Sequence, residues 1–336
     1  MPGTAPESSA TVGNAGLPVV GARSTATITD YIRLARPMQW AKGAFVVVGP
    51  VYGLAIRDVP SALAVFGAFL AFAFASSGCY VHNDVQDRER DRVHPRKRHR
   101  PIASGRIGVA HAYMFAIALF VLAAGMLLLV PTRENALGPR ALLAACVVLY
   151  VANVLAYSTW LKHKAVADVI SLSIGFVLRV LGGCAAVAIM PSTWLLNVTF
   201  FVSMFLAFGK RLGERRTMGE SASAARGVQL KYTDDLLRMA MVVTGVATLL
   251  TYAQYVQSQS EVYTHGFNLL WLTMLPATYC LLRAMVKVEV GEYDDPTDMA
   301  IRDRPFQLAV GCFGVITLLL ILWLRMKVLT FGPLVG

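Results

Sequence analysis

Long apolar segments separated by short charged ones are the feature that most constrains this chain. A membrane-spanning helix needs about 17–25 mostly apolar residues, and segments of that length recur along a sequence that is 56% hydrophobic and 15% charged. Soluble domains carry roughly a quarter charged residues. The pattern therefore predicts an all-α, polytopic membrane protein with nine transmembrane helices. The predicted helices cover 40–57, 62–81, 109–130, 140–160, 167–189, 193–209, 236–256, 267–286 and 306–328.

Lysine and arginine are distributed unevenly between the two sides that these spans define. With a cytoplasmic N-terminus, 25 of the 31 basic residues fall on the cytoplasmic side, five fall on the other side, and Arg179 lies inside the fifth span. Cytoplasmic loops of membrane proteins carry an excess of positive charge. The net charge of +11 is therefore explained by orientation in the bilayer, and no nucleic acid partner is expected. We predict a multi-pass plasma-membrane protein whose active site faces the cytoplasm.

The first residues differ in composition from the rest of the chain. They are rich in Ala, Gly, Ser and Thr and contain no long apolar run, which predicts a disordered tail over 1–27 and no signal peptide. A single transmembrane domain is expected over 28–336. The five cysteines show no C-x-x-C spacing, and we interpret them as small buried hydrophobic residues.

Carboxylates collect at the predicted cytoplasmic end of the second span, in the stretch NDVQDRERD. At about 100° per residue, Asp84, Asp87 and Asp91 fall within a helical arc of about 60°. Carboxylates on one face repel each other unless a cation neutralises them, and Mg²⁺ takes oxygen ligands and shares them with substrate phosphates. We predict a Mg²⁺–diphosphate site in which these three aspartates are catalytic. The predicted metal ligands are Asn83, Asp84, Asp87 and Asp91. The alternative is a solvated interfacial loop.

Polar and basic residues at other helix ends are candidates for binding phosphate groups. Arg179 lies roughly 16 Å into the fifth span, where a cation is costly and is read as functional by default. Its alternative role is a structural link to another helix, and the alternative for YSTWLKHK, residues 157–164, is an interfacial aromatic belt. The candidate substrate-binding residues are Gln39, Lys42, Lys97, Arg100, Tyr157, Lys162, Lys164, Arg179, Lys210, Arg211 and Glu214.

The chain resembles the UbiA superfamily of intramembrane prenyltransferases in its apolar spans, in Asn83-Asp84-Val85-Gln86-Asp87 through Asp91, and in YSTWLKHK. The resemblance implies a helical bundle with a cytoplasm-facing active-site cavity. It also implies a diphosphate held through Mg²⁺ by two Asp-rich motifs. The second motif, D-x-x-x-D after the sixth span, is absent here, and KRLGERR stands at 210–216 instead.

NDVQDRERDRVHPRKRHRPIASG and GKRLGERR are similar to the decaprenyl-phosphate phosphoribosyltransferase branch of that superfamily. The resemblance implies Mg²⁺-dependent transfer of phosphoribose from phosphoribosyl pyrophosphate (PRPP) to a polyprenyl phosphate, for cell-wall arabinan precursors. One alternative is prenyl transfer from a prenyl diphosphate to an aromatic acceptor, and another is a non-enzymatic transporter or channel. Small residues in the spans leave association into a homo-oligomer open.

Overall fold

The structure is a computed structural model that describes residues 26–93, 97–131, 138–218, 232–260, 264–265, 267–292 and 296–331. Helices make up these residues apart from loops and a ribbon of two short strands, β1 (Thr264–His265) and β2 (Phe267–Asn268), so the all-α prediction is confirmed. The tail predicted over 1–27 lies outside the described residues except for its last two. The helices are α1 (Ile28–Ala35), η1 (Pro37–Gly43), α2 (Ala44–Tyr52), α3 (Val59–Gln86), α4 (Arg88–Val93), η2 (Lys97–His99), α5 (Val109–Met126), η3 (Leu127–Leu129), α6 (Pro139–Thr159), η4 (Leu161–His163), α7 (Ala167–Ala186), α8 (Thr193–Met218), α10 (Asp234–Ser258), η7 (Leu269–Thr273), α12 (Met274–Val290), α13 (Pro296–Arg302) and α14 (Arg304–Phe331).

Eight helical segments in the described part of the chain are long and apolar enough to cross a membrane. They are α3, α5 with η3, α6, α7, α8, α10, η7 with α12, and α14, and they coincide with eight of the nine predicted spans. Only 22% of the apolar stretch of α5 is buried inside the protein. Since an apolar helix that the protein does not cover needs lipid around it, this is a multi-pass membrane protein.

The first predicted span does not form one continuous helix, and the prediction for 40–57 is wrong in that respect. Arg36 adopts a left-handed conformation (φ 53°) and ends α1, and Pro37 then opens the 3₁₀-helix η1. The following α2 has nine residues with Pro50 inside it, and so covers only about 13 Å of the roughly 30 Å of hydrocarbon. Within 40–57 the chain thus passes from η1 to α2, which ends at Tyr52, and the left-handed Leu54 (φ 50°) turns it away before residue 57.

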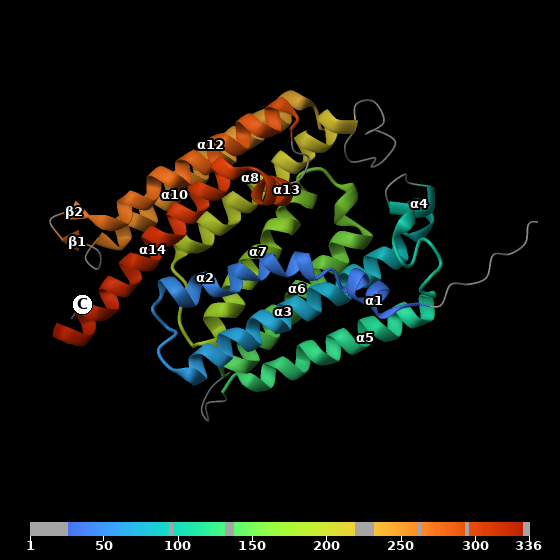
Figure 1. Ribbon diagram of the computed structural model, residues 1–336, viewed down its shortest axis with the longest axis horizontal. Coiled ribbons are helices and arrows are strands. Elements are labelled where there is room, and N and C mark those ends of the chain that lie inside the picture. The colour runs from blue at the N-terminus through green and yellow to red at the C-terminus, as the bar shows by residue number, and fades with distance from the viewer. Residues whose placement is uncertain are drawn as a thin grey trace, which may run out of the picture.

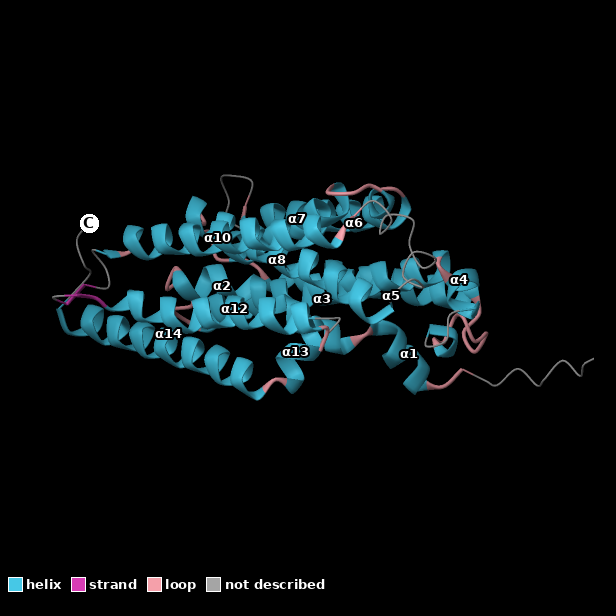
Figure 2. Ribbon diagram, turned by 90° about the horizontal axis from the view of Figure 1, so that it is seen from above, coloured by secondary structure: helices cyan, strands magenta, loops and turns pink. Residues whose placement is uncertain are grey.

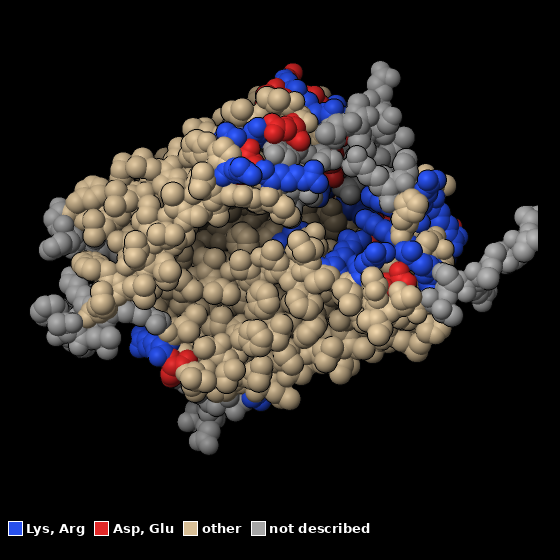
Figure 3. Space-filling model, viewed as in Figure 1, with Lys and Arg blue, Asp and Glu red and all other residues tan. Residues whose placement is uncertain are grey.

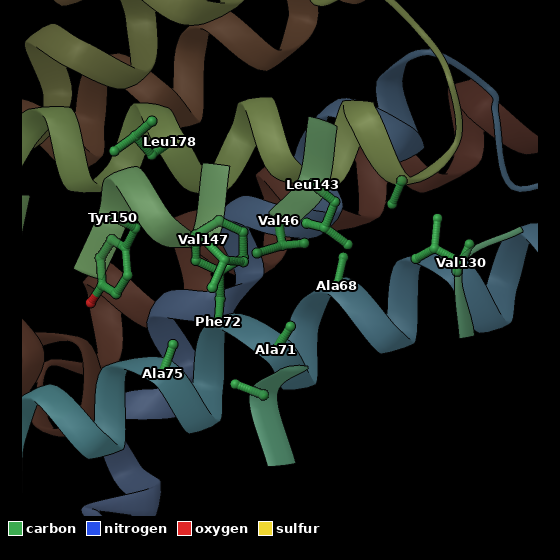
Figure 4. Packing of buried hydrophobic residues seen from close by; sticks show 13 residues of the cluster. Val46, Ala68, Ala71, Phe72, Ala75, Val130, Leu143, Val147, Tyr150 and Leu178 are labelled. Carbon is green, nitrogen blue, oxygen red and sulfur yellow. The ribbon is translucent and has the colours of Figure 1, made fainter. Parts of the chain in front are cut away.

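The helices run broadly alongside one another, and α1 and α4 both lie toward the same end of the bundle (Figures 1 and 2). The largest core cluster joins α2, α3, α6 and α7 around Phe72 and Leu143, with Val46 and Leu178 packed at its sides. In Figure 4 the ring of Tyr150 lies at the edge of this cluster. The core therefore holds together the helices whose polar ends and faces form the site described below.

A glycine allows α2 to approach α7 closely. A Cβ at Gly183 would lie 1.8 Å from the carbonyl oxygen of Val46, which is a backbone atom that a rotamer change cannot move away. We expect Gly183→Ala to lower the free energy of unfolding by about 1–3 kcal/mol through overpacking. Gly125→Ala is the control, because a Cβ on Gly125 meets nothing within 4 Å and alanine favours a helix by up to about 1 kcal/mol. Denaturant titrations in detergent that give equal effects for both variants would contradict the close approach.

Candidate active site

The acidic stretch lies where α3 ends and α4 begins, at the end of the bundle that α1 also reaches (Figure 1). Asp87 is the first residue after α3, yet its backbone N–H donates to Asn83 O at 2.9 Å, and the N–H of Asp91 donates to Asp87 O at 2.8 Å. These i→i−4 bonds carry the helical path across the boundary. The aspartates therefore keep the common direction that their spacing predicts.

Two of the three aspartates are buried and share an arginine. Arg36 Nη2 donates to Asp84 Oδ1 at 2.5 Å. Arg100 Nη1 donates both to Asp84 Oδ1 at 3.1 Å and to Asp91 Oδ2 at 2.7 Å. Only 3% of the surface of each aspartate is exposed. Because both carboxylates meet at one nitrogen, their oxygens converge on a single point.

The third aspartate lies at the edge of the same group. Lys162 Nζ donates to Asp87 Oδ1 at 3.0 Å, and Asn83 Nδ2 donates to Asp87 Oδ2 at 3.1 Å. Arginine and lysine side chains therefore already neutralise all three carboxylates, so their mutual repulsion does not by itself require a metal. Asp87 keeps 23% of its side chain exposed and is the most accessible of the three.

The donor chemistry of this group fits a hard divalent cation. The Arg100 nitrogen between Asp84 and Asp91 marks a position at which both carboxylates already offer an oxygen to a cation, and Mg²⁺ prefers oxygen ligands. No set of three or more His, Cys, Asp or Glu side chains in the described residues is arranged tightly enough to ligate one ion. An ion at this point would therefore be shared between protein oxygens and other ligands, as Mg²⁺ commonly is.

A cavity of about 160 Å³ adjoins the acidic group between α3, α6 and α7. Asn83 and Arg36 belong both to its wall and to the acidic group. None of the described residues that line it is acidic. Figure 3 shows one face of the molecule hollowed at its middle, with Lys and Arg side chains gathered along the upper edge and toward the right-hand end. The charged residues of the cavity wall are Arg36, Lys42 and Arg179.

Beside the cavity, Arg211 of α8 lies in a buried ion-pair network. Its Nε and Nη2 contact Asp168 Oδ2 at 3.2 and 3.1 Å, and its Nη1 donates to Glu214 Oε2 at 3.2 Å. Arg211 Nη2 also donates to the hydroxyl of Tyr157, which is one of the residues that line the cavity. The network thus connects α7 and α8 and holds one wall of the cavity in place.

A strained turn before α7 is attached to the same network. Val166 has φ 67°, a conformation that is unfavourable for a β-branched residue and costs on the order of 1–3 kcal/mol. Its N–H donates to the Tyr232 hydroxyl at 2.6 Å, and that hydroxyl donates to Asp168 Oδ1 at 2.8 Å. Burial raises the pKa of Tyr232, so the phenol keeps the proton that it donates. The turn at Val166 is the end of the short segment between α6 and α7, and this segment carries Lys162.

The remaining predicted residues lie apart from the cavity wall. Lys164 Nζ packs 3.4 Å from the centre of the Trp160 ring, an interfacial arrangement of the kind considered as the alternative for that stretch. Half-buried Gln39 lies in η1, Lys97 forms part of η2, and Lys210 precedes Arg211 on α8. Their roles stay predictions.

Sequence reasoning missed several residues of the cavity. Arg36 is one of them, and its position before a proline was the available signal for a turn that would direct its side chain elsewhere. Asn153 is a polar residue in the middle of an apolar span, which is a signal in itself. Tyr80 and Tyr150 carried no signal, because aromatic residues in a span are usually core.

An apolar helical bundle with an Asp-rich helix end and a cationic cavity beside it is the architecture of an enzyme that handles phosphate-bearing substrates within the membrane. The chain belongs to the UbiA prenyltransferase family, whose sequence pattern it matches over residues 43–310. This membership makes it a membrane-embedded enzyme of that family.

Named relatives and solved structures agree with the family. The decaprenyl-phosphate phosphoribosyltransferase of Mycobacterium tuberculosis is 34% identical over 84% of this chain and 90% of that protein. The protein of the same name from Corynebacterium glutamicum is 33% identical, with 82% of each chain covered. A UbiA homolog from Archaeoglobus fulgidus bound to GPP and Mg²⁺ has the same fold, with a TM-score of 0.62 and 18% identity over 88% of this chain and 98% of that one.

Proposed function

We propose that this protein transfers the phosphoribosyl group of PRPP to a polyprenyl phosphate, decaprenyl phosphate in particular, and releases pyrophosphate. The observation that carries the proposal is the excess of cations at the site. Lys42 and Arg179 line a cavity with no acidic wall residue in the described chain, together with Arg36, which also pairs with Asp84. The neighbouring aspartates have further cationic partners in Arg100 and Lys162. Two substrates that together bear a diphosphate, a sugar phosphate and a lipid phosphate need more positive charge than a prenyl diphosphate and an aromatic ring.

The relatives named above support the same assignment, since those proteins carry the name of this activity. The product would serve as a precursor for cell-wall arabinan. We place the enzyme in the plasma membrane as a single domain over 28–336, with its active site on the cytoplasmic side, where the positive-inside distribution of basic residues puts the acidic helix end.

Mg²⁺ is proposed as the cofactor, held by Asn83, Asp84, Asp87 and Asp91. When bound, Mg²⁺ would stabilise the negative charge that develops on the departing pyrophosphate. Arg100 and Lys162, which now contact the carboxylates, are in position to donate to diphosphate oxygens instead.

The transfer itself needs no strong general base. The phosphate of the acceptor lipid is already ionised, so one of its oxygens attacks C1 of the ribose, while the bond from C1 to the pyrophosphate oxygen breaks and pyrophosphate leaves with the electron pair. Charge builds up on the ribose as in an oxocarbenium ion. The protein contributes chiefly by positioning the two phosphates and by electrostatic stabilisation. Glu214 orients Arg211, which in turn holds Tyr157.

A label-transfer assay tests the proposal. Membranes that contain the protein are incubated with PRPP labelled in the ribose, decaprenyl phosphate and Mg²⁺, and label is measured in the organic phase. We expect label to appear there only when the lipid phosphate and the metal are both present, and to stay in the aqueous phase with EDTA. Transfer of label from a prenyl diphosphate to an aromatic acceptor, with none from PRPP, would instead support ordinary prenyl transfer.

A further inference from the structure

Arg179 is a buried cation that has no carboxylate partner among the described residues. Only 4% of its surface is exposed. Its Nη1 donates to the carbonyl oxygen of Gly175 at 3.0 Å, its Nη2 donates to the Tyr150 hydroxyl at 2.8 Å, and the guanidinium lies 4.4 Å from the centre of the Tyr150 ring. Within the described ranges of the chain, Arg179 forms no salt bridge. A charge buried in a membrane protein without a counter-charge is costly, so its presence here implies that an anion binds to it.

The cavity beside Arg179 is suited to a small anion. It has a volume of about 160 Å³, and Lys42 adds a second positive charge to its wall. Arg36 adds a third, although its guanidinium also contacts Asp84. Because the wall lacks an acidic residue in the described chain, an anion in the cavity would be bound by the protein's own cations without a metal.

The walls between these cations carry hydrogen-bonding groups. Asn153 Nδ2 donates to the carbonyl oxygen of Ser171 at 2.8 Å, and Ser171 Oγ donates back to Asn153 Oδ1 at 2.9 Å. Ser158 and Tyr157 add further hydroxyls to the lining. Amide and hydroxyl groups of this kind suit the hydroxyls of a sugar. An isoprenoid chain in the same place would form no hydrogen bond with these groups.

The cavity is continuous with the acidic group. Asn83 lines the cavity and also donates to Asp87, so a molecule can lie against both. Along α6 the lining extends from Tyr157 near the helix end to Tyr150, seven residues or roughly 10 Å deeper. A substrate with a diphosphate at one end and a monophosphate at the other would therefore reach from the aspartates to Arg179.

We propose that the cavity is the subsite for the ribose 5-phosphate end of PRPP, with the 5-phosphate bound to Arg179 and Lys42 independently of metal. The assignment rests on the proposed function and adds which phosphate occupies which position. The diphosphate stays at the aspartates, which places C1 of the ribose at the mouth of the cavity. The acceptor phosphate then approaches from outside the cavity, so that its isoprenoid chain never meets the polar walls.

Binding of half-substrates tests this assignment without turnover. Ribose 5-phosphate is titrated in EDTA against the full-length protein in detergent, and the rise in melting temperature is recorded, because a ligand that binds the folded state stabilises it. We expect binding by the wild type, weaker binding of inorganic phosphate, and at least tenfold weaker ribose 5-phosphate binding by Arg179→Met. Arg179→Lys should bind with intermediate affinity, because lysine keeps the charge but loses the fork of donors.

Two further measurements separate a ligand site from a structural arginine. Without ligand, Arg179→Met should melt no lower than the wild type, because methionine removes an unpaired buried charge, whereas a structural role predicts a lower melting temperature. Pyrophosphate with Mg²⁺ should bind Arg179→Met as it binds the wild type. The control variant is Arg57→Met, an exposed arginine in the loop between α2 and α3, which should leave all binding unchanged.

Other outcomes would overturn the assignment. One such outcome is that geranyl phosphate binds without metal and through Arg179, while ribose 5-phosphate does not bind. The cavity would then be assigned to the acceptor phosphate. Equal binding of ribose 5-phosphate by Arg179→Met and the wild type would remove Arg179 from the site. The proposed function is judged separately: label transfer from PRPP without ribose 5-phosphate binding contradicts only the subsite, and binding without label transfer contradicts only the reaction.

Discussion

Asp87→Asn is expected to reduce turnover by at least about 10²-fold while the protein still inserts and folds. The size of the effect follows from losing a charged group that acts on the developing negative charge, where a single stabilising contact is worth roughly 10²–10³-fold. Folding is expected to survive because Asp87 is partly exposed and asparagine can still accept a hydrogen bond from Lys162. Initial rates of label transfer over a range of Mg²⁺ concentrations measure the effect.

Glu89→Gln is the matched control for this variant. Glu89 lies two residues away and is exposed, and among the described residues it pairs only with Arg88 and Arg92, on the other side of the helix. Removing its charge should leave activity unchanged and stability within about 0.5 kcal/mol. If Asp87→Asn retained full Mg²⁺-dependent activity, the assignment of the acidic group to metal and diphosphate would have to be abandoned.

Arg211→Met is expected to destabilise the protein by about 3–5 kcal/mol. It removes the cation that pairs with Asp168, which has no exposed surface, and leaves an uncompensated charge next to Tyr232. Removing one partner of a buried ion pair costs about that amount. The double variant Asp168→Asn/Arg211→Met should recover part of the loss, because the buried carboxylate is then gone as well. Unfolding by denaturant in detergent gives the coupling energy of the two sites.

The comparison variant for this cycle is Arg238→Met. Arg238 also pairs with two carboxylates, those of Asp235 and Glu289, but all three side chains are substantially exposed. Exposed pairs contribute about 0–1 kcal/mol. A loss in Arg211→Met no larger than that in Arg238→Met would mean that the network does not hold α7 and α8 together. Stable protein with reduced activity would assign Arg211 to substrate binding, as the sequence predicts.

The sequence predicted a larger part of the fold than of the site. Eight of the nine spans coincide with long helices because length and hydropathy are local properties of a segment. The first span failed because α2 ends at Tyr52 and the left-handed Leu54 follows it, and hydropathy does not record such backbone conformations. At the site, spacing correctly placed Asp84 and Asp91 together on one side, since helical periodicity continues through Asp87.

The sequence by itself determined the class of protein, its multi-pass arrangement and the helix end that carries the acidic group. Only the tertiary structure decided which cations pair with the aspartates of that group and which are available to bind a ligand. Arg36 meets Asp84 across 48 positions of sequence, and Arg211 meets Asp168 across 43. Such pairings depend on how helices pack, and no periodicity within one helix encodes the side chain that a neighbouring helix presents. For the same reason, the missing counter-charge at Arg179 became visible only once all the helices that surround it were in place.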